Sequence, residues 1–580
     1  MENTIGLDSV HAAIRQVQNF LTPYLGIANT HGAEFLSDDH WHNYVSPTAQ
    51  SSLLELSCED LVNLSSLTIQ DNVKESNSVP SAAKHSKEVP DCARQKDEGV
   101  EDLRSFISEA EKCYLDRLDV LTSLDTILQR KPSTPDAISV VSEAMSEKKI
   151  HEVGVMVDAI SFLYKITQSD LVVDVGSGKG YFASEMSLRH KIPVVGFDSR
   201  DTNTHGASQR DKKLAKKWVG LERRKRLKQN SSSMVTDEKE RTHKNQSECP
   251  PNVTLTCDVH TETSKTAPGN GQGEDMCDES SSSVSSLDTM KTFSDFSSLP
   301  ESSRSFQQET TSCNLYTPVT LYVHPKMDLY KVIRQEAPQL GYSVPPRLFL
   351  SGLHTCGSLA VTTLNLFLQD PNVVGLCCVG CCYQLMEEFG PDNQQEEHFP
   401  ISVYGKRLGL QLGRNARNLA SQSVHRIRAS GQLQGGDFFW RALLNVLLSK
   451  LGIDVPERII GMRGLNKKSS NFQDYAAAAF KKLGLSDQLP DVCELQSLEE
   501  SYKDAHAKMS AFFQLKLVLA PVIETLILLD RLAFLLEQES VDKAHLVQLF
   551  DPVTSPRCFA IIAWKGLLKD ESLDESNPRN

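Results

Sequence analysis

The fold is read most directly from residues 171–182, LVVDVGSGKGYF. Residues 171–173 are apolar, as a buried parallel strand requires, and Asp174 follows at the expected end of that strand. Three glycines then predict a tight turn, and a helical pattern begins after it. Glycine lets the backbone adopt positive φ and approach a ligand closely, while the start of a helix offers free N–H groups. The stretch therefore predicts the first half of a nucleotide-binding unit.

The spacing of the glycines separates the classes of nucleotide site. A phosphate-binding loop needs GxxxxGK followed by Ser or Thr, which is absent here, and a dinucleotide-binding turn needs GxGxxG, but residue 181 is tyrosine. The observed spacing, DxGxGxG, resembles motif I of the class I S-adenosylmethionine-dependent methyltransferases. This resemblance implies that the turn lies beneath the methionine part of S-adenosyl-L-methionine. The residues implied to bind this cofactor are Asp174, Gly176, Ser177, Gly178 and Gly180.

A second acidic residue follows the next expected strand. Residues 193–197 read PVVGF, and Asp198 ends this run. An acid about 20 residues past the glycines is where a carboxylate meets the ribose hydroxyls in doubly wound nucleotide-binding folds. Asp198 is therefore a further candidate cofactor-binding residue. The alternative is an ordinary Rossmann half that binds another nucleotide or none.

The composition is that of a large globular protein with reduced thiols. The chain has 580 residues, of which 39% are hydrophobic and 23% charged, with a net charge of −14. The N-terminal sequence MENTIGLDSV lacks a secretion signal, and the 14 cysteines follow no disulfide pattern. We therefore expect a cytoplasmic or nuclear protein, not a secreted one. The apolar run 517–536 contains three charged residues and a proline, so we expect a buried helix and no membrane association.

Changes in composition divide the chain into four parts. They are a helical region at 1–140, the first part of an α/β domain at 141–229, a disordered Ser- and acid-rich insertion at 230–314, and the second part of the domain at 315–580. Within the first part we expect a polar linker near 70–100 and one helix over about 101–128. Within the last part we expect a helical insertion near 384–536.

After the disordered insertion, short apolar runs alternate with helical patterns. This alternation predicts a parallel sheet with helices on both faces. The last two runs are joined by a segment with two prolines, which suits a hairpin and predicts an antiparallel final pair. The expected strands lie at 319–323, 347–353, 373–379, 544–550 and 558–564. With the first two strands they give an α/β fold that resembles the Rossmann-like seven-stranded sheet of class I methyltransferases.

The carboxyl ends of the strands are the expected place of the active site, because ligands of open α/β sheets collect there. That rule places Asp174, Asp198, His324, His354 and the turn after Val379 along one rim. His354 lies in GLHTCG, at the expected end of the fourth strand, where it could accept a proton from the methyl acceptor. It could equally bond a backbone carbonyl and only shape the pocket. The Asn/Asp-Pro-Pro-Tyr/Phe motif of adenine-N6 enzymes is absent here.

Cysteines near the ends of the fourth and fifth strands raise the question of a metal. The motif CCxxCC comprises Cys377, Cys378, Cys381 and Cys382, and the fourth strand is followed by His354 and Cys356. Zinc could bind such ligands. However, adjacent residues of a strand face opposite sides, buried cysteine packs as a small apolar residue, and a second CxxC is lacking. We therefore expect no metal.

Basic segments are candidate docking surfaces for a macromolecule. Residues 210–228 carry ten Lys or Arg against two acids, a local charge of 10 − 2 = +8, and residues 406–417 carry four more basic residues. The first segment is open to three interpretations, which are a solvated helix face, a phosphate-contacting surface and a nuclear import signal. A further charged cluster comprises Lys148, Lys149, His151 and Glu152. It borders the cofactor pocket if the resemblance holds, or it is an ordinary solvated helix start.

Six short motifs together resemble the methyltransferase-like protein 25 family. They are KKIHEV, DVGSGKG, NTHGA, GLHTCG, VGCCY and LGRNARNLA, and the resemblance covers roughly residues 140–228 and 315–580. It implies a methyltransferase but names no acceptor. Our leading hypothesis is transfer of a methyl group from S-adenosyl-L-methionine to a macromolecule, protein or RNA, with His354 as the polar group at the acceptor. One alternative is a cofactor-binding scaffold without turnover that acts through the basic helix and the insertion. Another is a nicotinamide-dependent oxidoreductase, which the early third glycine disfavours.

Overall fold

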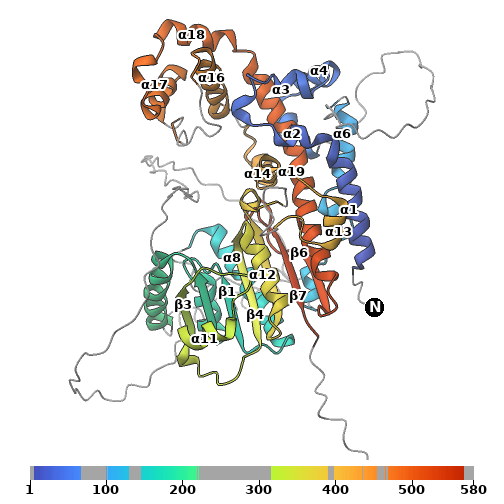
Figure 1. Cartoon of the computed structure of the whole chain (residues 1–580), viewed down its shortest axis with the longest axis vertical. Helices are drawn as coiled ribbons and strands as arrows, with labels where there is room; N and C mark the ends of the chain where they lie inside the picture. Colours follow the sequence, from blue (N-terminus) through green and yellow to red (C-terminus); the bar gives the residue numbers. More distant parts are fainter. Residues whose placement is uncertain are drawn as a thin grey trace, which may run out of the picture. The chain divides into compact units, whose positions relative to one another are not determined.

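The computed structural model describes residues 5–66, 100, 102–129, 145–218, 220, 315–388, 398–433, 436–453, 464–465 and 468–566. Its strands are β1 (Leu171–Val175), β2 (Val194–Asp198), β3 (Tyr316–Thr320), β4 (Leu348–Cys356), β5 (Val373–Cys381), β6 (Lys543–Gln548) and β7 (Phe559–Trp564). They form one sheet in the order β3-β2-β1-β4-β5-β7-β6 (Figure 1). Strands β1 to β5 are parallel, and β7 is antiparallel to both of its neighbours. The predicted seven-stranded α/β fold is confirmed.

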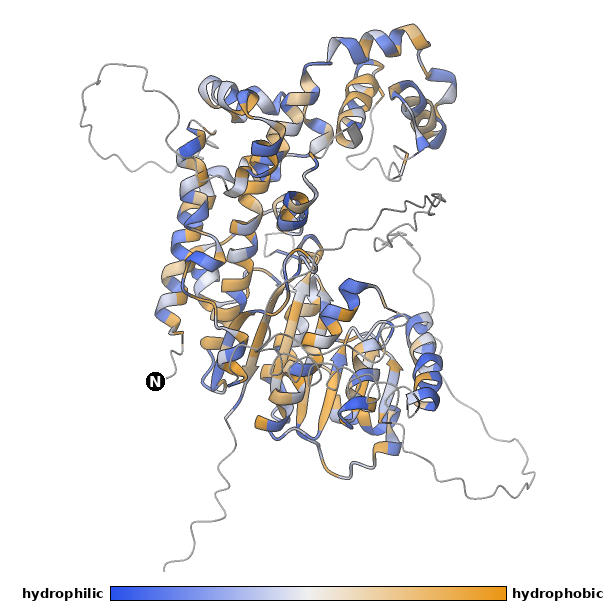
Figure 2. Cartoon of the chain, turned by 180° about the vertical axis from the view of Figure 1, so that it is seen from behind, coloured by the Kyte–Doolittle hydropathy of each residue, from blue (hydrophilic) through white to orange (hydrophobic). Residues whose placement is uncertain are grey.

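Alternating side chains of the strands pack into two hydrophobic cores, one on each face of the sheet. Val172 belongs to the core formed with α8 (Glu147–Ile166) and α9 (Tyr181–Arg189). Val173, one residue later, belongs to the core formed with α12 (Ser358–Gln369) and α19 (Ala505–Leu536). Figure 2 shows hydrophobic residues concentrated along the strands. Burial on both faces explains why β5 is a continuous apolar run and why β1 contains only one polar residue, Asp174.

Helices from the two ends of the chain pack against one another. Tyr114 donates its hydroxyl to the carbonyl of Val518 at 3.1 Å, and Lys516 Nζ donates to the carbonyl of Thr30 at 2.7 Å. The N-terminal helices are α1 (Leu7–Leu21), α2 (Leu25–Asn29), α3 (His40–Tyr44), α4 (Pro47–Glu55), α5 (Cys58–Val62), α6 (Leu103–Glu111) and α7 (Leu124–Ile127). The later helices are α11 (Leu329–Glu336), α13 (Val403–Leu408), α14 (Arg414–Ala420), α15 (Val424–Ser430), α16 (Gly436–Lys450), α17 (Phe472–Leu483) and α18 (Val492–Ser501). Both sets contact α19, which is therefore the centre of the helical part.

The apolar run predicted to be a buried helix lies within α19. Among the described residues this helix alone is long and apolar enough to cross a membrane, yet 78% of its most apolar 18-residue window is buried inside the protein. Its charged residues have internal partners. Asp530 accepts hydrogen bonds from the N–H groups of Ile401 and Ser402 at 2.7 and 3.1 Å, and Glu524 accepts one from the Tyr383 hydroxyl at 2.8 Å.

Several predicted strand boundaries need correction, among them the end of β6, which is residue 548 instead of 550. Strand β3 covers residues 316–320 instead of 319–323, while β4 and β5 continue to residues 356 and 381 instead of 353 and 379. The longer strands pair as far as Cys356 and Cys381, past a register shift between Leu353 and Thr355. Irregular pairing of this kind leaves no mark on hydrophobic periodicity, so the sequence pattern ends too early. The predicted insertion at 230–314 and most of the predicted linker near 70–100 lie outside the described residues.

The single helix predicted over about 101–128 is wrong. Helix α6 ends at Glu111, and the short helix α7 follows only after Asp119, whose φ is +50°. Between them the chain leaves the helix to reach the outer strand of the sheet. There the N–H of Thr122 donates to the carbonyl of Leu546 in β6 at 2.9 Å. A hydrogen bond to an exposed strand edge thus outweighs local helical periodicity.

Candidate functional site

The glycine turn between β1 and α9 requires three residues without side chains. Gly176, Gly178 and Gly180 have φ values of +73°, +53° and +69°, in the left-handed region. A Cβ at Gly180 would lie 2.5 Å from Tyr316 Oη, and one at Gly176 would lie 3.3 Å from a methyl of Leu359. A Cβ at Gly178 would meet only the carbonyl oxygen of Gly176, at 3.9 Å. Gly180 is therefore needed for packing, whereas the outer side of Gly178 is open.

Asp198 fixes this turn from the end of β2. Its Oδ2 accepts the N–H of Gly178 at 2.9 Å, and its Oδ1 accepts the N–H of Arg200 at 2.9 Å and the Asn203 amide at 3.0 Å. Ser177 lies against the backbone of β2, because a Cβ at Gly196 would be 2.8 Å from Ser177 Cβ. The structure thus brings the two predicted motifs together. Their role in binding a cofactor stays a prediction.

The sequence predicts Asp174 at the end of β1, but the strand continues through Val175, so Asp174 lies inside it. Its carboxyl group is buried, with Oδ1 3.5 Å from the Ser351 hydroxyl. Burial raises the pKa of Asp174 to about 7, although the charge of Lys149 opposes the shift. Asp174 is therefore a carboxyl group close to its titration point at neutral pH.

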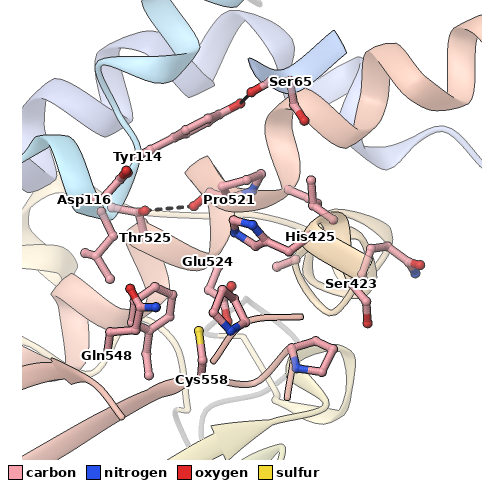
Figure 3. Close-up of a pocket in the computed structure, with 18 of the residues that line it drawn as sticks. Ser65, Tyr114, Asp116, Ser423, His425, Pro521, Glu524, Thr525, Gln548 and Cys558 are labelled. Carbon is pink, nitrogen blue, oxygen red and sulfur yellow. Dashed lines mark hydrogen bonds between the residues drawn. The ribbon is translucent and has the colours of Figure 1, made fainter. Parts of the chain in front are cut away.

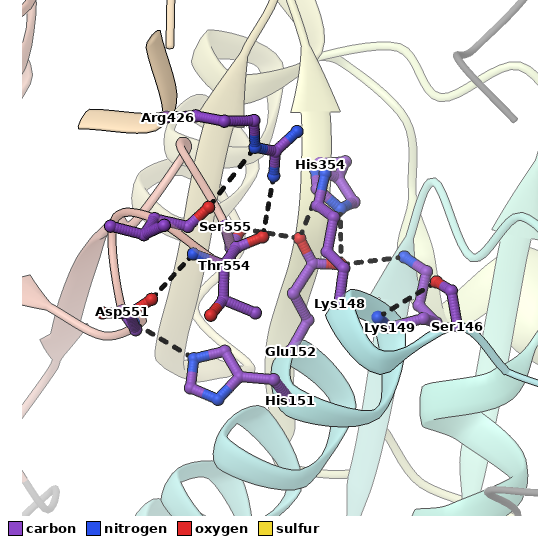
Figure 4. Close-up of polar contacts among 11 residues, drawn as sticks. Ser146, Lys148, Lys149, His151, Glu152, His354, Arg426, Asp551, Thr554 and Ser555 are labelled. Carbon is purple, nitrogen blue, oxygen red and sulfur yellow. Dashed lines mark hydrogen bonds and ion pairs between the residues drawn. The ribbon is translucent and has the colours of Figure 1, made fainter. Parts of the chain in front are cut away.

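His354 and Glu152 form a pair that joins β4 to α8 (Figure 4). The imidazole Nε2 lies 3.0 Å from Glu152 Oε2, and Lys149 Nζ donates to the same oxygen at 3.2 Å. The other oxygen, Oε1, accepts the hydroxyl of Ser555 at 2.7 Å. Burial alone would raise the pKa of Glu152, but the hydrogen bond from His354 and the charges of His354 and the lysines hold it below its usual value. Glu152 is therefore ionised and accepts hydrogen bonds on both oxygens.

A β-bulge sets the direction of the His354 side chain. The residue was predicted to follow the fourth strand, but β4 continues past it to Cys356. Its φ is +65°, and the pairing with β5 shifts register between Leu353 and Thr355. A left-handed conformation costs a non-glycine residue on the order of 1–2 kcal/mol and persists only where the surroundings impose it. The sequence marked Glu152 only as part of a charged cluster, and nothing in it paired this acid with a histidine 202 positions away.

The β6–β7 connection borders the Glu152–His354 pair. The N–H of Asp551 donates to His151 Nε2 at 3.1 Å, and Arg426 of α15 donates to the carbonyl of Thr554 at 2.9 Å (Figure 4). Ser555, in the same connection, donates to Glu152. Helix α8 and the later helices therefore both anchor the loop that borders the Glu152–His354 pair. His324, by contrast, is an exposed residue beyond β3 whose Nδ1 accepts the N–H of Lys326 at 3.2 Å.

The cysteines divide into two groups. Cys377 and Cys378 are buried within β5 and pack into opposite cores, as strand alternation predicts. A different set meets at the carboxyl ends of β4 and β5. There the sulfur atoms of Cys356, Cys381 and Cys382 all lie within 4.8 Å of one another. Spacing alone does not reveal this trio, because it depends on the pairing of residues 25 positions apart.

The basic segments are less uniform than their composition suggests. The helix over residues 201–218 leaves Lys212, Lys213, Lys216 and Lys217 exposed, whereas Arg210 stacks over the Tyr181 ring at 4.6 Å and donates to the carbonyl of Lys179. The remainder of 210–228, apart from residue 220, lies outside the described residues. In the second segment Lys406, Arg407 and Arg414 are exposed, whereas Arg417 is buried 2.6 Å from Glu388 and so is no part of an exposed docking surface.

A cavity of about 220 Å³ lies among the N-terminal helices, α15, α19 and the β6–β7 connection (Figure 3). Residues of opposite charge line it, with Glu524 and Arg557 paired at 2.9 Å in its wall. It contains none of the predicted cofactor-binding residues. It shares the β6–β7 connection with the Glu152–His354 pair, since Pro556, Arg557 and Cys558 lie just beyond Ser555.

Comparison with known proteins agrees with this geometry. A family model described as a methyltransferase domain matches residues 148–389. The chain is 30% identical to the proteins named "Probable methyltransferase-like protein 25" of Homo sapiens and Mus musculus, over 97% of this chain and 98% of each relative. The resemblance predicted for 140–228 and 315–580 therefore extends to the N-terminal helices as well. No solved structure matches the chain significantly. The seven-stranded sheet, the glycine turn and the full-length similarity together show that this chain is a member of the methyltransferase-like protein 25 family and carries its methyltransferase domain.

Proposed function

We propose that this protein is an S-adenosylmethionine-dependent methyltransferase that acts on a macromolecule, protein or RNA. The observation that carries the proposal is the glycine turn. Three left-handed glycines lie at the carboxyl end of the central strand, and Asp198 of the next strand holds them by the Gly178 N–H. The carboxyl ends of adjacent parallel strands are where open α/β sheets bind nucleotides.

The residues present fit this cofactor. The outer side of Gly178 is open, as an adjoining ligand requires. Asp174 and Asp198 are close enough to interact electrostatically, and carboxylates favour a cationic ligand. When bound, S-adenosylmethionine supplies a methyl group on a positively charged sulfur. In this assignment Asp174, Ser177 and the glycines hold its methionine part, and Asp198 takes its ribose hydroxyls.

His354 is suited to take a proton from the acceptor. Because ionised Glu152 accepts a hydrogen bond at Nε2, the proton of a neutral imidazole lies on Nε2, and Nδ1 is left as a proton acceptor. The side chain is 28% exposed, so a substrate can reach it. Once Nδ1 takes a proton, the carboxylate stabilises the imidazolium. Glu152 thereby orients His354, while alignment of the two reactants supplies the larger share of the rate, on the order of 7–11 kcal/mol.

A macromolecular acceptor is favoured by the charge beside the glycine turn. Arg210 bonds the carbonyl of Lys179 in that turn, and the same helix presents four exposed lysines, at 212, 213, 216 and 217. Such a surface attracts the phosphates of RNA or the acidic side chains of a protein.

Cofactor binding tests the first part of the proposal. Isothermal titration of the full-length protein with S-adenosylmethionine should show one site, and Gly178→Ala should weaken binding at least about tenfold because the new methyl occupies the open side of the turn. Gly341→Ala is the matched control, since Gly341 also has a left-handed φ, +72°, and open space around it. Equal loss in both variants, or no binding to the wild type, would contradict the proposal.

Methyl transfer tests the second part. Lysate of cells lacking the protein is incubated with tritiated S-adenosylmethionine and the purified full-length enzyme, and label should enter protein or RNA. Treatment with protease or ribonuclease then identifies the class of acceptor. If a folded protein that binds the cofactor labels neither class, the scaffold interpretation replaces the enzyme.

A further inference from the structure

Three thiols converge beside the Glu152–His354 pair. Cys356 ends β4, Cys381 ends β5, and Cys382 follows directly. The sulfur atoms of Cys356 and Cys381 lie 3.1 Å apart, and all three lie within 4.8 Å of one another. In a tetrahedral site with metal–sulfur bonds of about 2.3 Å, ligand sulfurs are about 3.8 Å apart. The trio is therefore compact enough to contact one small metal ion, and the Cys356–Cys381 distance would have to widen by about 0.7 Å when the ion binds.

The backbone holds the thiols in place before any ion binds. Cys356 and Cys381 are register partners in the parallel pairing of β4 with β5. Cys382 has a φ of +51°, a left-handed conformation that cysteine rarely adopts, so that two consecutive residues present their sulfurs to the same point. Among the described residues, seven non-glycine positions are left-handed. One of them is Cys382 itself, and another is His354, two residues before Cys356.

Zinc binds the thiolate form of cysteine, so the thiol protons of the trio would leave as the ion enters.

We propose that Cys356, Cys381 and Cys382 bind one zinc ion at the carboxyl ends of β4 and β5. Thiolate ligands select zinc, copper(I) or iron–sulfur clusters, and zinc accepts tetrahedral sites built from three protein ligands. The trio fills three of the four positions, and the fourth ligand comes from outside it. The site is separate from the glycine turn, and it lies on the rim where the methyl acceptor is expected.

Metal analysis of the full-length protein tests the site directly. The protein is purified with a tag free of histidine and with a thiol reductant that does not bind metal. Its zinc content is then measured by inductively coupled plasma mass spectrometry. About one zinc per chain is expected. Cys356→Ser, Cys381→Ser and Cys382→Ser should each lose most of it. Cys377→Ala is the matched control, because this buried cysteine of β5 packs in a core on one face of the sheet.

A second measurement does not depend on the folding of variants. Replacement of the bound metal by cobalt(II) in the wild-type protein should give thiolate-to-cobalt charge-transfer bands and the visible bands of a tetrahedral site. The proposal is overturned if protein with all three thiols reduced contains no zinc and binds none when it is added. It is also overturned if Cys377→Ala lowers the zinc content as much as the three serine variants, or if a Cys356–Cys381 disulfide occupies the site. None of these outcomes depends on binding of S-adenosylmethionine, so failure here leaves the proposed function untouched.

Discussion

The Nε2 atom of His354 lies 3.0 Å from a carboxylate oxygen of Glu152, and this contact connects residues 202 positions apart. The carboxylate is buried, and it is held from three further directions by Ser555, Lys148 and Lys149. A side chain fixed by this many partners cannot swing to serve several roles. We expect Glu152 to hold the imidazole in a single orientation while it also accepts the hydroxyl of Ser555 in the β6–β7 connection.

Replacement of Glu152 by glutamine should therefore impair turnover more than binding. Glu152→Gln keeps the shape but removes the charge that stabilises protonated His354. We expect kcat to fall by about 10- to 100-fold, as for other groups that orient a functional histidine, with little change in the affinity for S-adenosylmethionine. Glu185→Gln is the control, because Glu185 is an equally buried acid on α9. Equal kinetics for Glu152→Gln and wild type would remove Glu152 from the mechanism.

The buried carboxyl of Asp174 should make stability depend on pH. Its pKa is about 7 in the folded protein and about 3.8 when unfolded, so the folded state holds more protons between these values. The stabilising contribution of Asp174 is thus complete below about pH 4 and is lost as pH rises through 7. In Asp174→Asn this position does not titrate, so it contributes nothing to the pH dependence of the free energy of unfolding. Urea unfolding at pH 5.5 and 8 should show the variant gaining stability relative to wild type at the higher pH, and a constant difference would contradict the assignment.

Two glycines of the same turn should behave differently. Gly180→Ala places a methyl 2.5 Å from Tyr316 Oη and 2.9 Å from Ala207 Cβ, so we expect a loss of about 1–3 kcal/mol in the free energy of unfolding. Gly178→Ala meets open space, and its cost should be limited to backbone strain of about 1 kcal/mol. Thermal and chemical unfolding distinguish the two. Similar losses in both would show that the space around Gly178 is also filled.

The hydrophobic pattern predicts most strands of the sheet, but it does not predict which way side chains at the strand ends point. Most strands contain a short apolar run, and β1 and β5 are buried on both faces, so the sequence identifies them, whereas the more polar β3 lies three residues before its predicted place. The orientation of His354 depends on a bulge in β4, and the cysteine trio depends on the register of β4 against β5. Both are properties of pairing between distant segments. Neither can be predicted from one sequence, because the same sequence is compatible with regular pairing of β4 and β5 as well as with the shifted pairing seen here.

Arg417 shows that the exposure of a basic residue is likewise not predictable from the sequence. In the sequence it is one of four basic residues in 406–417, but in the structure it is buried against Glu388. Removing one partner of a buried pair leaves the other uncompensated, so Arg417→Ala should destabilise the protein by about 3–5 kcal/mol. Arg414→Ala, on the same helix but exposed, should change stability by less than about 0.5 kcal/mol. Differential scanning calorimetry checks both, and equal melting temperatures would contradict the burial of Arg417.

The exposed lysines beside the glycine turn provide a test of docking. Changing Lys212, Lys213, Lys216 and Lys217 together to glutamate should raise the KM for the macromolecular acceptor and weaken the dependence of KM on salt. The affinity for S-adenosylmethionine should stay the same, because these side chains are exposed to solvent. Unaltered acceptor kinetics in this variant would show that the acceptor binds elsewhere.

The hydrogen bond from Thr122 to β6 has a practical consequence for dissecting this protein. The segment matched by the methyltransferase family model stops at residue 389, so a fragment cut to it would lack β6 and β7 and would leave β5 with an unpaired flank. A fragment that starts after residue 130 would instead lack Thr122 and so lose its hydrogen bond to β6. Either truncation offers bare strand backbone to another copy, which invites aggregation. The integrity of this sheet is thus tied to a segment of the chain that comes before its first strand.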